Sequence, residues 1–191
     1  VELVTIFVAL ELLSVALYGL AAFHRRGSVS SEAAIKYFLM GALVSSFVLY
    51  GAALVYGETG STTITGISAA LAAGTGSPGL IFLGFLLLIC GFGFKLGLVP
   101  FHAWAPDVYQ GAPSPFVAFL SVAPKAASAV VLARLVILVA SSPTAGDWTK
   151  LVSVLAIASM LVGNLFALAQ RDIKRMLAYS GIAHMGYLLI P

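Results

Sequence analysis

Long apolar segments constrain the fold of this sequence more than any other feature. A helix needs about 20 predominantly apolar residues to cross the hydrocarbon core of a bilayer. Six segments meet this condition, at residues 1–23, 32–56, 80–104, 115–140, 148–169 and 173–191. The intervening residues 57–79 are rich in Gly, Ser and Thr, and we expect a short interfacial helix near residues 67–73. The sequence therefore predicts an all-α polytopic membrane protein with about six transmembrane helices.

The composition supports this fold class and excludes several kinds of function. Hydrophobic residues make up 61% of the chain, charged residues only 9%, and the mean hydropathy is +1.07. Soluble domains are about one quarter charged, so an ordinary soluble domain is excluded. The sequence has no phosphate-binding loop, dinucleotide fingerprint, cysteine cluster or haem motif, and Cys90 is the single cysteine. We expect no cofactor and no metal in this chain.

Both ends of the sequence lie within apolar segments, and the first residue is not Met. We therefore expect an internal piece of a longer protein, in which residues 1–191 form a single transmembrane domain.

Basic residues in the short connections predict the orientation of the spans. Connections with many Lys and Arg residues usually face the cytoplasm. By alternation of the spans, the first and fifth connections lie on one side of the membrane, and we expect that side to be cytoplasmic. The basic residues of these two connections are Arg25, Arg26, Lys36, Arg171, Lys174 and Arg175. The net charge of +3 is thus explained by membrane orientation, and it does not indicate a nucleic-acid partner.

Charged side chains inside the predicted spans are the strongest functional signal. Glu11, Lys95 and Lys125 each lie deep in an apolar segment. A charge at a helix centre costs about 2.5–3.5 kcal/mol on insertion scales, and such residues usually mark ion or proton paths. The alternatives are a buried Glu11–Lys95 ion pair that only locks two helices and a Lys125 that reaches the interface. Arg134 is close enough to a helix end to have a structural role.

Lysine suits proton transfer because its ammonium group readily loses its charge when it is desolvated. A nearby carboxylate favours the charged form, and its removal favours release of the proton. Glu11 and Lys95 would form such a switch, and Lys125 would be the next carrier.

A predicted helix break near Pro100 follows Lys95. Proline removes a backbone donor and interrupts helices, and broken helices in transporters line ion paths. His102 and His184 are candidate proton relays, although each has an equally good structural explanation. Asp107, in the predicted loop after the break, is expected to bond backbone N–H groups. The small residues Gly93 and Gly97 are expected to allow close helix packing.

Four stretches resemble a known family. They are FKLGLVPFHAWAPDVYQGAPSP, VALELLSVALYGL, KYFLMGALVSSFVLYG and RDIKRMLAYSGIAHMGYL. Together they resemble the antiporter-like membrane subunits of respiratory complex I, a family to which the Mrp antiporters are related. The form PDVYQGAPSP favours the branch related to mitochondrial subunit 2 over the longer antiporter-like subunits and the Mrp antiporters. The resemblance covers essentially the whole chain.

The resemblance implies a fold, a set of site residues and partners. It implies that this chain is a fragment of a 14-helix antiporter-like fold, with Glu11, Lys95 and Lys125 in a proton half-channel and a central relay. It implies that NADH, FMN, iron–sulfur clusters and quinone bind in partner subunits, and that the partners are the other membrane-arm subunits and the lipid bilayer. The implied location is the inner (plasma) membrane of the cell, or the thylakoid membrane in a photosynthetic complex.

Three functions follow as hypotheses. The first is a proton-translocating subunit of an NADH–quinone oxidoreductase, which pumps protons while the redox chemistry occurs in other subunits. The second is a subunit of an Mrp-type cation/proton antiporter. The third is a structural spacer whose buried charges only lock helices together.

Overall fold

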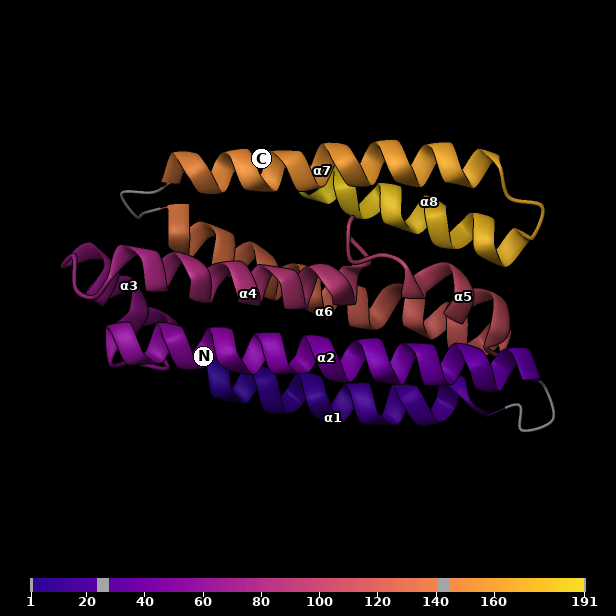
Figure 1. Cartoon of the computed structure of the whole chain (residues 1–191), viewed down its shortest axis with the longest axis horizontal. Helices are drawn as coiled ribbons and strands as arrows, with labels where there is room; N and C mark the ends of the chain where they lie inside the picture. The colour runs from indigo at the N-terminus through magenta and orange to yellow at the C-terminus, as the bar shows by residue number, and fades with distance from the viewer. Residues whose placement is uncertain (1, 24–27, 141–144, 191) are drawn as a thin grey trace.

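The computed structural model describes residues 2–23, 28–140 and 145–190, and eight helices account for most of this part of the chain (Figure 1). The helices are α1 (Leu3–Ala21), α2 (Ser28–Thr59), α3 (Ile64–Ala72), α4 (Pro78–Leu96), α5 (Trp104–Gly111), α6 (Ser114–Ala140), α7 (Ala145–Leu168) and α8 (Ile173–Leu188). The predicted all-α class is confirmed, and α3 lies where the short helix is predicted.

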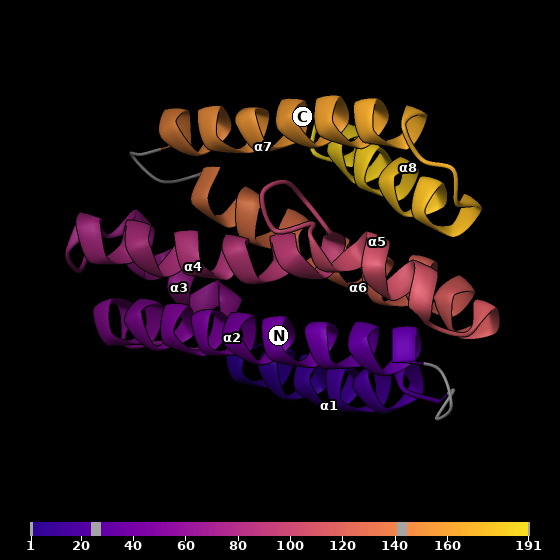
Figure 2. The ribbon, with the colours of Figure 1, turned by 45° about the vertical axis from the view of Figure 1, so that its right-hand side comes forward.

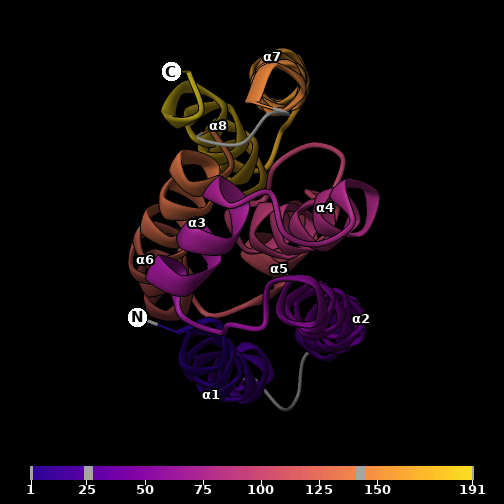
Figure 3. The same ribbon diagram turned by 90° about the vertical axis from the view of Figure 1, so that its left-hand side faces the viewer.

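The long helices form a bundle of three layers. The pair α1–α2 lies on one side, the pair α7–α8 lies on the other, and α4, α5 and α6 lie between them (Figures 1 and 3). The most extensive packing joins α2 to α4 and α7 to α8. The middle layer is consequently the most buried part of the bundle, and it carries both Lys95 and Lys125.

Five of the described helices are long and apolar enough to cross a membrane, so the chain is a multi-pass membrane protein. They are Leu3–Ala21, Val29–Thr59, Pro78–Leu96, Ser114–Ala140 and Gly146–Leu168. Helix α8, which covers most of the sixth predicted span, has 16 residues and is not one of these five.

The third predicted span, residues 80–104, is interrupted near Pro100 as predicted, and its last residue, Trp104, begins α5. The helix α4 ends at Leu96, and Gly97 follows with a φ of 77°, in the left-handed region that glycine adopts most readily. The N–H of Leu98 then donates to the carbonyl of Gly93 at 2.8 Å, which completes a common helix ending. The residue that ends the helix is therefore Gly97, and Pro100 lies inside the turn that follows.

Small residues allow the backbones of α2 and α4 to approach closely. A Cβ atom on Gly51 of α2 would lie 2.7 Å from the carbonyl oxygen of Gly84 on α4. Of the pair Gly93 and Gly97, only Gly97 lies against other helices, where a Cβ atom would be 3.7 Å from Ile182 of α8 and 3.9 Å from Ala105 of α5. Gly93 faces Phe101 in the turn, and Gly97 ends the helix.

The two basic connections lie at the same end of the bundle, as predicted. The C-terminal end of α1, the N-terminal end of α2 and the α7–α8 turn are all at this end (Figure 1). We call it the basic end and define it by Lys36, Lys174 and Arg175. Arg25 and Arg26, named above, lie outside the described residues. The cytoplasmic location of the basic end remains a prediction.

Candidate functional site

The interrupted helix places Lys95 beside a helix terminus in the interior of the bundle. Lys95 lies in the last turn of α4, and it is 8% exposed. The last carbonyl groups of a helix have no partners in the helix and carry partial negative charge. An ammonium group in the last turn is stabilised by this charge.

Side chains from neighbouring helices satisfy polar groups that the interruption sets free. The indole Nε1 of Trp104 donates to the carbonyl of Phe94 at 2.8 Å, and the hydroxyl of Ser159 on α7 accepts from the N–H of Val99 at 3.0 Å. The turn accordingly projects toward α7 and α8 (Figure 2). Unpaired backbone groups are costly in a bilayer, so these two contacts stabilise the break.

Lys95 contacts a hydroxyl group, and the predicted ion pair with Glu11 is not formed. Its Nζ donates to Ser14 Oγ on α1 at 2.6 Å, and Ser14 Oγ donates to the carbonyl of Leu10. Glu11 instead accepts a hydrogen bond of 2.6 Å from Ser45 on α2. Glu11 and Ser14 are three residues apart and therefore lie on neighbouring positions of one helix face. Ser14 therefore lies beside the Lys95 ammonium, where the sequence predicts the Glu11 carboxylate.

A cavity of about 260 Å³ adjoins Lys95 between α1, α4 and α6. Its walls are largely apolar, and Lys95, Ser14 and Ser128 are among its lining residues. The cavity gives the Lys95 amine space in which water can be accommodated.

Lys125 is the second buried amine, and it lies in the interior of α6 next to Pro124. Lys125 is 3% exposed, and its Nζ lies 5.7 Å from the centre of the Tyr109 ring on α5. Within the described residues, Lys125 has no ion pair with an acidic side chain. A ring face attracts a cation, so the Tyr109 ring gives Lys125 electrostatic support from an uncharged group.

A second cavity, of about 580 Å³, joins Lys125 to the basic end. It lies between α5, α6 and α8, and its lining includes Lys125, His184, Tyr109, Ser180 and Lys174. Hydroxyl, imidazole and amine groups on these walls are able to bind water. Lys125 and Lys174 thus line one cavity, in which these polar groups stand among apolar ones.

The histidines and Arg134 occupy different positions. His184 is exposed and lines the same cavity as Lys125, so the structure brings these two predicted residues together. His102 lies 6.5 Å from the Tyr179 ring on α8, and its buried Nδ1 has no hydrogen-bond partner among the described residues. Within the described part of the chain, no hydrogen bond joins His102 to Lys95. Arg134 is exposed on α6.

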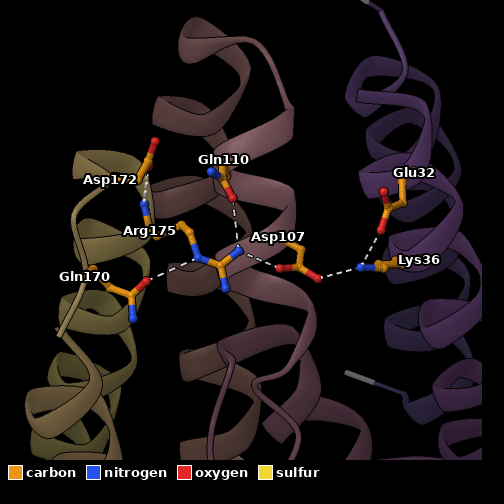
Figure 4. Close-up of polar contacts among 7 residues, drawn as sticks. All are labelled: Glu32, Lys36, Asp107, Gln110, Gln170, Asp172 and Arg175. Atoms are coloured by element: carbon orange, nitrogen blue, oxygen red, sulfur yellow. Dashed lines mark hydrogen bonds and ion pairs between the residues drawn. The ribbon is translucent and has the colours of Figure 1, made fainter. Parts of the chain in front are cut away.

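Asp107 joins three helices, and the predicted contact with backbone N–H groups in a loop is wrong. Asp107 lies on α5, where its carboxylate accepts from Lys36 of α2 at 2.8 Å and from Arg175 of α8 at 2.6 Å (Figure 4). Arg175 also donates to Gln110 and Gln170. Burial raises the pKa of Asp107, but the hydrogen bonds from Lys36 and Arg175 outweigh this effect and hold the pKa below its usual range.

The comparisons with known proteins agree with this geometry. The sequence model described as NADH:quinone oxidoreductase/Mrp antiporter, TM matches residues 1–191. The chain belongs to this family. One curated relative, NADH-quinone oxidoreductase subunit N of Myxococcus xanthus, is 49% identical over 190 residues, which are 99% of this chain and 37% of the relative.

Solved structures with a similar fold include two membrane complexes. A chain of respiratory complex I from Thermus thermophilus with bound aureothin superposes with a TM-score of 0.82 at 47% identity, covering 97% of this chain and 39% of that one. A chain of the Mrp complex from Dietzia sp. DQ12-45-1b superposes with a TM-score of 0.84 at 26% identity, covering 98% and 35%. The chain therefore spans less than half the length of these members of the NADH:quinone oxidoreductase/Mrp antiporter family.

Several residues of the site in this family member could not be predicted from the sequence. Ser14 and Ser45 are ordinary small polar residues in apolar helices, and Tyr109 is one aromatic residue among many. The only available signal for Ser14 is its position three residues after Glu11, on the same face of α1. Which hydroxyl or ring contacts each lysine depends on the packing of helices that are distant in sequence.

Among the described residues, no group of three or more His, Cys, Asp or Glu side chains lies close enough together to hold a metal ion. The titratable and hydroxyl-bearing groups of the site are amines, an imidazole, hydroxyl groups and a carboxylate.

Proposed function

We propose that this chain forms the proton-translocating part of a membrane subunit of an NADH–quinone oxidoreductase. The proposal rests on the burial of two lysines and on the contacts that they make. Lys95 and Lys125 are 8% and 3% exposed, in the middle layer of a bundle of membrane-spanning helices. Lys95 donates to the Ser14 hydroxyl, and the Tyr109 ring lies 5.7 Å from Lys125 Nζ. A structural ion pair would require a carboxylate in direct contact, and none of the described carboxylates lies within 4 Å of either amine.

Protons would move through the two cavities in sequence. Water in the cavity between α5, α6 and α8 would link the basic end to Lys125, with His184 on the wall as a relay. Lys95, with Ser14 and the nearby Glu11, would hold the next proton. The half-helix ending at Gly97 supports this role, because it places partial negative charge beside Lys95.

The redox chemistry would occur in partner subunits, which would bind NADH, FMN, iron–sulfur clusters and quinone. The remaining membrane subunits and the lipid bilayer would be the partners of this chain. Moving one charge against 100 mV requires about 2.3 kcal/mol, so pumping requires coupling to that chemistry. The bacterial relatives favour the inner membrane as the location; in a photosynthetic complex it would be the thylakoid membrane.

An Mrp-type cation/proton antiporter subunit is the second candidate. The similarity in fold to the Mrp complex favours it, with a TM-score of 0.84. The identity of 26% with that complex is well below the 49% with the oxidoreductase subunit, so the oxidoreductase function is preferred.

The test is Lys95→Met in the full-length subunit within its complex, with quinone reduction and proton uptake measured in the same sealed vesicles. Lys150→Met is the matched control, because Lys150 is an exposed lysine paired with Asp147. We expect Lys95→Met to abolish proton uptake and the coupled electron transfer, with Lys150→Met at wild-type levels. Wild-type uptake and electron transfer by an assembled Lys95→Met complex would overturn the proposal. Purification of the native complex without any flavin or iron–sulfur protein would favour the Mrp-type function.

A further inference from the structure

Helix α5 contacts the surroundings of both buried lysines. Its Trp104 bonds the carbonyl of Phe94, the residue before Lys95, at 2.8 Å. Its Tyr109 ring lies 5.7 Å from Lys125 Nζ. The displacement of this one element would change the environment of both amines.

The position of α5 depends on contacts with its neighbours, because the helix is short. It has eight residues, and isolated helices shorter than about 12–15 residues are marginal in water. Packing against α2 holds one face, where the Trp104 ring stacks on Tyr37 with centroids 4.8 Å apart and planes 20° apart. A ring stack restricts the position of a helix less sharply than a hydrogen bond, whose strength falls steeply as its angle changes.

Asp107 supplies the directional contacts that stacking lacks. One carboxylate oxygen accepts from Lys36 on α2, and the other accepts from Arg175 on α8, on the opposite side of α5 (Figure 4). Glu32 binds the same Lys36 at 2.8 Å, and Gln170 binds Arg175; Gln110, which also lies on α5, is a second α5 acceptor for Arg175. Each cation is therefore held in place by a further side chain. A shift of α5 toward either neighbour would break the bond to the other one.

We propose that Asp107 is a positioning residue for proton transfer. By holding α5 between α2 and α8, it sets where Trp104 lies relative to the end of α4 and where the Tyr109 ring lies relative to Lys125. The inference rests on the proposed function and extends it to a carboxylate that touches neither lysine.

The experiment compares Asp107→Asn with Asp107→Glu in the full-length subunit within its complex. Asparagine keeps the size of the side chain and removes its charge, whereas glutamate keeps the charge. Asp147→Asn is the matched control, since Asp147 forms an exposed ion pair with Lys150 on α7. Two quantities are measured in sealed vesicles: hydrogen–deuterium exchange of the amides of residues 104–111, and protons taken up per quinone reduced.

We expect Asp107→Asn to exchange these amides several-fold faster and to take up several-fold fewer protons per quinone. Asp107→Glu should restore most of both, and Asp147→Asn should match the wild type. Lys36→Gln removes only one of the two ion pairs, so it should show a smaller change in the same direction; this variant also serves if Asp107→Asn does not assemble.

Wild-type proton uptake in Asp107→Asn or, where that variant does not assemble, in Lys36→Gln would overturn the inference, whether or not the exchange of α5 changes. An equal loss of uptake in Asp147→Asn would overturn it as well. Lys95→Met, measured beside these variants, separates the two proposals. Normal pumping by Lys95→Met contradicts the proposed function, whereas normal pumping by Asp107→Asn alone contradicts only the positioning role.

Discussion

The middle layer and the basic end both contain basic side chains. The two groups differ in their burial and in their ion pairs. At the basic end, Lys36 and Arg175 each form an ion pair with Asp107. Their side chains are 45% and 27% exposed. In the middle layer, Lys95 and Lys125 are almost fully buried, and neither forms an ion pair within the described residues.

Under the proposed function, this difference separates charges that hold the fold from charges that carry protons. A buried amine without a carboxylate carries a desolvation cost that a methionine of similar volume would not have. The ion pairs of the basic end avoid this cost, because water and opposite charges surround them. Retaining an expensive amine in the interior is understandable when the amine binds and releases a proton.

The largest effect is expected for Lys125→Met. Proton transfer through a positioned side chain contributes about 10²–10⁴-fold to a rate, so proton uptake should fall by about a hundredfold or more. Because a buried charge is removed, the thermal stability of the solubilised complex should stay the same or rise, by about 1–3 kcal/mol. Arg134→Met, an exposed cation on the same helix, is the control and should keep wild-type uptake. Loss of stability together with loss of uptake would contradict the contrast between the two regions.

The next effect is expected for Ser14→Ala, which removes the hydroxyl that accepts from Lys95. A buried charged donor that loses its partner costs about 1–3 kcal/mol. Proton uptake should fall roughly tenfold, as 1.4 kcal/mol corresponds to a factor of ten. Ser46→Ala serves as the control, since Ser46 bonds only the carbonyl of Leu43 on its own helix and is exposed. Unchanged uptake and stability in Ser14→Ala would show that Lys95 does not depend on this contact.

A smaller effect is expected for Gly181→Ala on α8. A Cβ atom at this position would lie 3.0 Å from Lys125 Nζ, so the ammonium has to move. The end of a flexible side chain moves easily, and we expect a stability change below about 1 kcal/mol with a several-fold fall in proton uptake. Gly57→Ala on α2, where a Cβ atom would meet nothing within 4 Å, is the control. Equal uptake in both variants would show that the position of the Lys125 amine is not critical.

The smallest effect concerns pH and the basic end. The pKa of Asp107 is lower in the folded protein than its ordinary value. Its ion pairs therefore contribute stability above the unfolded pKa of about 3.9, and this contribution is lost as the pH falls through the lower folded value. The thermal midpoints of the wild type and Asp107→Asn should differ at pH 7 and converge toward pH 3. A constant difference across this range would show that the carboxylate charge does not stabilise the basic end.

Periodicity and charge predict much of the fold because both depend on local sequence. Long apolar segments define five of the spans, and the basic connections place two chain turns at one end of the bundle. The predictions from the sequence are inaccurate where two local features compete. Pro100 is the stronger helix breaker in the sequence, yet Gly97 ends α4 because its left-handed conformation completes the helix ending first.

The sequence alone determined that this protein lies in a membrane. It also identified Glu11, Lys95 and Lys125 as unusual residues, because charged side chains are rare in apolar membrane-spanning segments. Only the tertiary structure decided which groups those charges meet. Ser14 rather than Glu11 contacts Lys95, the Tyr109 ring lies beside Lys125, and Asp107 joins α2 to α8. The physical reason is that partners across helices are set by the rotation and spacing of elements far apart in the chain. Ser14 lies three residues after Glu11 on the same face of α1, so the packing of the helices decides whether a hydroxyl or a carboxylate contacts Lys95.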